Sequence, residues 1–561
     1  MLYRFSLVLA AAVTLSACGG VAGTLDTAAE LIAEGGQRQL REPMRPVTDG
    51  PRVLVLAFDG VGEATLRRAL AGGRMPRLGA FLGPGSTDAA LTSDVWQRAA
   101  VASQAVSVFP AETAPGWAAV YTGEPPARNG VTGNEWFERD SVAVFAPVPL
   151  SVGTIEQTLE IWADSLIGEV IQVPTVFERA DVRAHVASAF VYRGADLLTL
   201  PDLNDFGDLL EAAGAFVFGN AQAVYEEVDD DTWEGVQAGV EQFGVPRLQV
   251  AYFPGVDLLA HAEGGSQQLD YLEEEIDPHV GKILDLWAER GVLDETYVVV
   301  VSDHGHTDVL SDEVHSLGGG SEGTDRPAVL VDSLGFRLRD FAVGADTSDA
   351  NVVMIYDEAV AMLYAADRSV CPDEGQVCDW RAAPRLREDV LPLARGFADA
   401  SATGRHVPEL AGTLDLVFAR ASDPSGRTSP PFQVWVRDTT LADGGRLEAV
   451  GAYLARTGRS DLVDLERRLG WLTDGPLGHR AGDVLLLAKA GEDQPLAERY
   501  YFGTPRSSGH GSAAASDGHI AFVLAHAARS GTELQARLRA AVGERPTQLS
   551  VTPLILDLLA E

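Results

Sequence analysis

The sequence predicts an α/β fold in which helices cover both faces of a mostly parallel sheet. Two continuous apolar runs, at residues 52–58 and 297–302, have the composition of strands that are buried on both faces. The second run follows a segment with apolar residues at helical spacing, namely Leu272, Ile276, Val280, Ile283 and Trp287. Because strand, helix and strand alternate, we expect a doubly wound sheet, in which ligands bind at the carboxyl ends of the strands.

Changes in composition divide the 561-residue chain into four kinds of segment. A stretch rich in Gly, Pro and charged residues precedes the first apolar run. After the second apolar run, the pattern of turn-forming residues changes. Further strands are expected at residues 482–487 and 519–524. The expected segments are a signal peptide at 1–18, a tether at 19–50, a catalytic α/β domain at 51–310 and 480–561, and an inserted cap or subdomain at 311–479.

Residues 1–18 have the features of an export signal. Arg4 provides a positive start, and the apolar run from Phe5 to Leu15 is too short to cross a bilayer as a mature helix. The run ends in Leu15-Ser16-Ala17-Cys18, which resembles the bacterial lipobox and implies lipidation of Cys18. Gly19 follows in place of aspartate, which in lipoproteins implies an outer-membrane destination, facing the periplasm or cell surface. An ordinary secretory signal is the alternative.

The net charge of −38, from 81 acidic and 43 basic residues, disfavours a nucleic-acid-binding groove. Nearly all basic residues are arginine, since the chain contains only Lys282 and Lys489 as lysines. Beyond Cys18 the remaining cysteines are Cys371 and Cys378, which flank a short turn-like segment. In an oxidising compartment a disulfide is a better interpretation than a metal pair, because no histidine lies at a suitable spacing.

Residues that serve as metal ligands or nucleophiles follow several of the apolar runs. Asp257 and His261 are four residues apart, so both side chains lie on one face of a helix. Each such residue has a plain structural alternative, such as a helix N-cap or a surface pair, but their joint occurrence favours a metal site. The candidates are Asp59, Thr113, Asn134, Asp257, His261, Asp303, His304 and His510.

In this order the segments resemble the type I phosphodiesterase/nucleotide pyrophosphatase branch of the alkaline phosphatase superfamily. The resemblance covers about residues 51–310 well and 480–530 moderately. It implies an alkaline-phosphatase-like fold and two zinc ions. One zinc would bind the residues matching Asp257, His261 and His510; the other would bind those matching Asp59, Asp303, His304 and the nucleophile Thr113.

The chemistry of these residue types agrees with that assignment. Zinc accepts histidine nitrogen and carboxylate oxygen, and a pair of zinc ions stabilises the attacking and leaving oxygens in phosphoryl transfer. Coordination would activate Thr113 to form a phospho-threonine, and Asn134 would donate a hydrogen bond to a phosphoryl oxygen. Three nearby histidines are expected to have supporting or loop roles, because both sites are already filled; these are His306, His315 and His519.

The sequence therefore predicts a zinc-dependent phosphodiesterase that acts on a small phosphate ester, such as a nucleotide or a phospholipid-derived diester. No lysine precedes Lys282 to bind a doubly charged phosphoryl group, although Arg193 is a candidate substitute. A phosphomonoesterase on the same site is the main alternative. A phosphonate hydrolase or a sulfatase ranks lower, the latter because no Cys-x-Pro-x-Arg sequence is seen. A noncatalytic surface-binding lipoprotein that keeps the fold is the alternative from another class.

Overall fold

The computed structural model describes most of the chain. The predicted signal peptide at 1–18 and residues 19–35 of the predicted tether lie outside the described residues. Among the described residues, no helix combines the length and apolarity needed to cross a membrane. The described ranges are 36–145, 170–201, 222–318, 325–340, 349–423 and 429–561.

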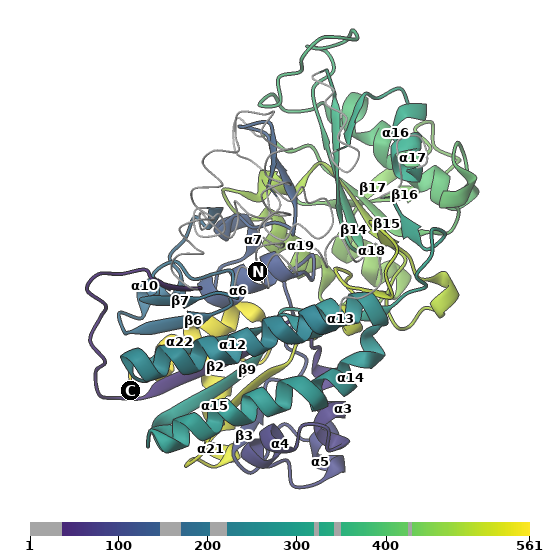
Figure 1. Ribbon diagram of the computed structural model, residues 1–561. Helices are drawn as coiled ribbons and strands as arrows, with labels where there is room; N and C mark the ends of the chain where they lie inside the picture. Colours follow the sequence, from purple (N-terminus) through teal and green to yellow (C-terminus); the bar gives the residue numbers. More distant parts are fainter. Residues whose placement is uncertain (1–35, 146–169, 202–221, 319–324, 341–348, 424–428) are drawn as a thin grey trace, which may run out of the picture.

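The main sheet has eight strands in the order β1-β7-β6-β8-β2-β9-β21-β3 (Figure 1). Strands β7, β6, β8, β2 and β9 run parallel to one another. Strand β1 pairs antiparallel with β7, and β21 pairs antiparallel with both β9 and β3. The predicted doubly wound, mostly parallel sheet is therefore confirmed. The bounds are β1 Gln37–Gln39, β2 Arg52–Phe58, β3 Ala99–Val101, β6 Ala184–Ala187, β7 Leu197–Thr199, β8 Leu248–Phe253, β9 Thr296–Val301 and β21 Phe522–His526.

Helices cover both faces of this sheet. Alternate residues of β2 enter two different core clusters, Val55 on one face and Leu56 on the other, which explains the continuous apolar run. One face packs against helices α3 Glu63–Ala71, α4 Pro76–Leu82, α12 Gln222–Phe243, α13 Gly255–Glu263 and α15 Asp277–Glu289. The other packs against α6 Thr113–Thr122, α10 Val176–Arg179, α21 Gly531–Val542 and α22 Val551–Leu559.

A second sheet of seven strands lies beside the first, in the order β12-β13-β14-β18-β15-β16-β17 (Figure 1). Helices α16 Arg326–Ser333 and α17 Leu391–Thr403 pack on one face, and α18 Val450–Thr457 and α19 Leu465–Thr473 on the other. The strands are β12 Leu338–Asp340, β13 Val352–Asp357, β14 Val360–Ala365, β15 Leu414–Ala419, β16 Gln433–Arg437, β17 Gly445–Ala449 and β18 Val484–Ala488.

One strand differs in its placement from the sequence analysis. The run at 482–487 forms β18, but β18 pairs with β14 and β15 of the second sheet and not with the catalytic sheet. The chain returns to the main sheet only at β21. We therefore propose that the second subdomain extends beyond the expected boundary at residue 479 to include β18. Both sheets bury both faces of their central strands, so an apolar run does not reveal to which sheet it belongs.

Two short strand pairs join the subdomains near the carboxyl end of the main sheet. Strand β10 Thr307–Asp308 pairs with β20 Ser508–Gly509, and β11 Ser316–Leu317 pairs with β19 Tyr501–Phe502. They bring the segment around residue 510 to the loop that follows β9. Within the second subdomain Cys371 and Cys378 form a disulfide, as the sequence analysis favoured.

Candidate functional site

The candidate residues gather where three adjacent strands of the main sheet end. Asp59 directly follows β2, and Asp303 follows β9 after one residue. Asp257 and His261 lie on α13, which begins two residues after β8. Strands β8, β2 and β9 are direct neighbours and run parallel, so their carboxyl ends meet at one edge.

The predicted nucleophile lies at the start of a helix. Thr113 is the first residue of α6 and is almost fully buried, and its Oγ1 lies 3.3 Å from Nε2 of His304. Asn134 reaches the same point from a neighbouring loop, because its Oδ1 accepts a hydrogen bond from the Ala114 amide at 2.8 Å. The N-terminus of a helix presents backbone N–H groups and positive potential, which suits a phosphoryl group.

Asp59, Asp303 and His304 form the first candidate metal group. One ligand atom from each lies within 4.8 Å of the others, and all three side chains are buried. Asp59 Oδ2 accepts hydrogen bonds from Trp117 Nε1 and Tyr252 Oη, and Asp303 Oδ1 accepts one from the Gly60 amide. The remaining oxygens, Asp59 Oδ1 and Asp303 Oδ2, have no hydrogen-bond partner. Two orphaned carboxylate oxygens beside one imidazole are a donor set that a divalent cation satisfies.

Asp257, His261 and His510 form the second group. The Nε2 atoms of His261 and His510 lie 3.2 Å apart, and Asp257 lies 3.4 Å from His261 and 4.0 Å from His510. His510 lies in the loop after β20, more than two hundred residues after Asp257 and His261 in the sequence. The structure thus brings together all of the candidate ligand residues that the sequence analysis named, and Thr113 lies against one of them, His304.

The three predicted histidine ligands share one arrangement of hydrogen bonds. In each ring Nδ1 lies 3.0–3.1 Å from a backbone carbonyl oxygen: Ser508 for His261, Gly305 for His304 and Ala111 for His510. A nitrogen next to a carbonyl must carry the proton, so Nε2 keeps its lone pair. All three Nε2 atoms therefore face the cluster as acceptors, which is the state that a metal ion requires.

Among the described residues, no cation contributes to the pKa shifts of Asp59 and Asp303, whereas Asp257 interacts with His261 and His306, which hold its pKa well below its usual range. Burial raises the pKa of Asp59 to about 8, and repulsion from Asp257 acts in the same direction. Burial and the charge of Asp59 likewise raise the pKa of Asp303 well above its usual range. Burial lowers the pKa of His304 to about 3, so this imidazole stays neutral. Carboxylates that repel one another beside neutral imidazoles are stabilised when a cation lies between them.

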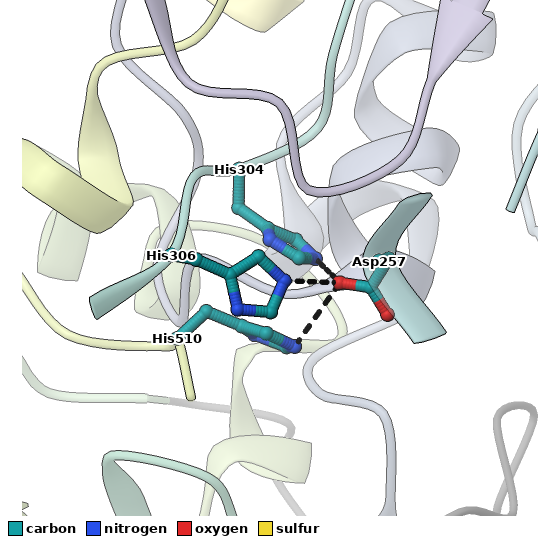
Figure 2. Close-up of side chains that lie close together, drawn as sticks. All are labelled: Asp257, His304, His306 and His510. Carbon is teal, nitrogen blue, oxygen red and sulfur yellow. Dashed lines mark hydrogen bonds and ion pairs between the residues drawn. The ribbon is translucent and has the colours of Figure 1, made fainter. Parts of the chain in front are cut away.

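His306 takes part more directly than the sequence analysis expected. Figure 2 shows His304, His306 and His510 converging on one oxygen of Asp257. His306 Nε2 lies 2.6 Å from Asp257 Oδ1, and its Nδ1 lies 2.9 Å from Ser508 Oγ. Gly60 has a φ of +67°, and a Cβ there would lie 2.7 Å from both His306 Nε2 and Asp257 Oδ1. Only glycine leaves room for this contact.

Glu358 is a member of the cluster that the sequence analysis missed. Its carboxylate lies within 4.8 Å of ligand atoms of His261 and His510. Its position directly after the apolar run that forms β13 is a signal in the sequence, but that run lies in the segment expected to be the cap. Arg193, the candidate phosphate-binding arginine, instead donates to the Ile171 and Val173 carbonyls and pairs with Glu178, so these contacts give it a structural role.

Comparison with known proteins identifies a matching family model and a relative of low sequence identity. A family model for "Type I phosphodiesterase / nucleotide pyrophosphatase" matches residues 53–319. Ectonucleotide pyrophosphatase/phosphodiesterase 2 of Saccharomyces cerevisiae is 22% identical over 220 residues. That match covers 36% of this chain and 39% of the yeast protein, so the chain spans about two fifths of that relative.

Two solved structures have a similar overall course of the chain at low sequence identity. Phosphonoacetate hydrolase from Sinorhizobium meliloti 1021, in complex with phosphonoformate, is 15% identical with a TM-score of 0.48, covering 93% of this chain and 100% of the other. An inactive variant of murine ectonucleotide pyrophosphatase/phosphodiesterase 5, in complex with AMP, is 13% identical with a TM-score of 0.46, covering 91% and 95%.

The matched segment contains every proposed ligand except His510. Residues 53–319 therefore match the type I phosphodiesterase/nucleotide pyrophosphatase family that the sequence analysis named.

Proposed function

We propose that the chain is a zinc-dependent phosphodiesterase or nucleotide pyrophosphatase with Thr113 as its nucleophile. The observation that carries the proposal is the convergence of three histidine Nε2 atoms and three carboxylates, with the Thr113 hydroxyl 3.3 Å from one of these nitrogens, Nε2 of His304. Their nitrogen and oxygen donors match the preference of zinc, and the orphaned oxygens of Asp59 and Asp303 provide open ligand positions.

Each residue has a defined role in this proposal. Asp59, Asp303, His304 and Thr113 would hold one zinc ion, and Asp257, His261 and His510 the other. When bound, the two ions supply Lewis-acid stabilisation of the oxygens that carry negative charge during displacement at phosphorus. Thr113 Oγ1 forms a bond to phosphorus as the bond to the leaving oxygen breaks, and water later hydrolyses the phospho-threonine.

The surroundings of Thr113 orient the phosphoryl group. Asn134 is held in place by the Ala114 amide through Oδ1 and by Glu112, whose Oε2 accepts from the Asn134 backbone at 3.0 Å. The donor end of its side-chain amide is then Nδ2, which suits a nonbridging phosphoryl oxygen. The first turn of α6 adds backbone N–H groups on the same side.

The charges near the site favour a diester over a monoester. Arg506 is a cation close enough to act on His261, but its guanidinium is already paired with the buried carboxylate of Glu358. A phosphodiester carries one negative charge and needs fewer cations than a doubly charged monoester. A phosphomonoesterase on the same site is the second candidate, since the metal groups serve either reaction.

We propose that the chain is exported and held at the outer membrane through a lipid on Cys18. This proposal is supported by three features that follow one another at the N-terminus: a positively charged residue, a short apolar run and a lipobox-like tetrapeptide. A lipid anchor on a terminal cysteine would leave the catalytic subdomain exposed to soluble phosphate esters.

The direct experiment compares three substrates on purified protein: bis-p-nitrophenyl phosphate, p-nitrophenyl phosphate and a nucleotide diester. We expect the diesters to be hydrolysed faster, and a chelator to abolish turnover that added zinc restores. Faster hydrolysis of p-nitrophenyl phosphate would favour the monoesterase. Less than about one zinc per chain, with no turnover on any substrate, would favour a noncatalytic binding protein.

A further inference from the structure

A carboxylate from the second subdomain reaches into the candidate metal cluster. Glu358 lies in the turn between β13 and β14, and one of its oxygens is within 4.8 Å of ligand nitrogens of both His261 and His510. We propose that Glu358 is a fourth protein ligand of the metal that Asp257, His261 and His510 hold. The inference rests on the proposed function only in requiring that this group binds a metal ion.

The backbone of Glu358 is held in a conformation that glutamate rarely adopts. Its φ is +56°, in the left-handed region, which carries an energetic cost for a residue with a side chain. Two hydrogen bonds lock the turn to the site: the Phe502 amide donates to the Glu358 carbonyl at 2.6 Å, and the Ala359 amide donates to the His510 carbonyl at 3.0 Å. A strained residue that its surroundings hold so closely is typical of a functional position.

The chain around His510 leaves space for this side chain. A Cβ at Gly509 would lie 3.0 Å from Glu358 Oε2, and a Cβ at Gly511 would lie 3.2 Å from Glu358 Cβ. The glutamate therefore packs over the backbone on both sides of His510, where a larger residue would displace it. This packing directs the carboxylate toward the imidazoles and away from solvent.

The two oxygens of Glu358 have different environments. Oε1 forms an ion pair with Arg506, and both side chains are less than a tenth exposed. Oε2 has no hydrogen-bond partner although it is buried. A buried carboxylate oxygen without a partner is costly, and coordination to a metal would satisfy it. Arg506 then acts as a positioning residue that orients the ligand through its other oxygen.

A fourth protein ligand changes what the second subdomain does. Three-ligand zinc sites leave one position for water or substrate, whereas four protein ligands close the tetrahedral set. Glu358 would fill that position in the free protein, or make the site five-coordinate when substrate binds. Through Glu358, metal binding would then also link the β13–β14 turn of the second sheet to the main sheet.

The test compares zinc affinity in four full-length proteins by competition with a chromophoric chelator. We expect Glu358→Gln to weaken the affinity for one of two zinc ions by at least about 10-fold, and Arg506→Gln to weaken the same ion less. The matched control is Glu138→Gln, which breaks another largely buried ion pair, with Arg480 at 2.7 Å. That control should bind both ions like the wild type.

A second readout follows the coordination sphere itself. In cobalt-substituted protein, Glu358→Gln should alter the visible absorption of one site, whereas Glu138→Gln should not. If Glu358→Gln does not fold, Glu358→Asp keeps the charge but shortens the reach, and the same changes are expected. Wild-type affinity and spectrum in the folded Glu358 variant would overturn the inference, and the proposed function would stand if the wild type binds zinc and turns over. A wild type that binds no metal would refute both.

Discussion

At the scale of single residues, the direction of each imidazole is set by the backbone. The backbone carbonyls of Ser508, Gly305 and Ala111 each accept a hydrogen bond from Nδ1–H of one histidine ring. The Nε2 atoms of these three rings therefore face the carboxylates. The arrangement resembles the support that metal-binding histidines commonly receive from a second hydrogen-bonded group. Because these partners are main-chain atoms, most substitutions of the partner residues would keep them.

Thr113→Ala removes the attacking oxygen while leaving the six carboxylate and imidazole ligands in place. We expect folding and zinc content to remain and turnover on a diester to fall to a small fraction of the wild-type rate. Thr122→Ala, at the far end of the same helix, is the control and should keep its activity. Turnover of Thr113→Ala above about a tenth of the wild type would show that another group is the nucleophile.

At the scale of elements, the site depends on three parallel strands that end together. Continuous apolar runs predicted β2 and β9, since both strands are covered on two faces, and the i, i+4 spacing predicted that Asp257 and His261 share a face of α13. The neighbouring strand β6 carries a buried histidine, His185, which lies opposite Gln249 of β8. This residue links the stability of the sheet to pH.

Burial lowers the pKa of His185 to about 4, against 6.5 for an exposed histidine. The unfolded chain therefore binds a proton between pH 6.5 and 4 that the folded chain does not, so stability falls as the pH drops through this window. The full shift corresponds to about 3 kcal/mol. Urea unfolding at several pH values should show a smaller loss on acidification for His185→Gln than for the wild type.

The control for this prediction is His406→Gln, a change at an exposed histidine of the second subdomain. It should leave the acid-dependent loss of stability unchanged. An equal loss in the wild type and in His185→Gln would show that His185 is not the group responsible.

At the scale of the whole molecule, two sheets meet at the site. The core cluster that includes Phe109, close to the nucleophile, continues into β13, β14 and α19 of the second subdomain. The turn that carries Glu358 extends from that same sheet. The second subdomain is therefore part of the surroundings of the proposed nucleophile and of the candidate metal groups. Substitutions at its packing surface should affect metal binding as well as stability.

The proposed lipid anchor also concerns the whole molecule. Cys18→Ser should release the protein from membranes into the soluble fraction, because it removes the thiol that would be lipidated. Fractionation of cells that express the wild type and the variant measures this directly. Unchanged association with membranes would contradict the anchor, and Cys371→Ser is the control, since that cysteine is bound in the disulfide.

The sequence by itself determined the strands β2 and β9 and the shared helical face of Asp257 and His261 on α13, and it predicted six candidate metal ligands. These features are local: each depends on periodicity, on burial of both faces of a strand, or on a residue type that directly follows a strand. Only the tertiary structure placed β18 in the second sheet, gave Arg193 its structural role, and brought His306 and Glu358 to Asp257, His261 and His510. Those contacts join residues far apart in the chain, and their geometry depends on strand order and on a strained turn, neither of which leaves a periodic pattern in the sequence.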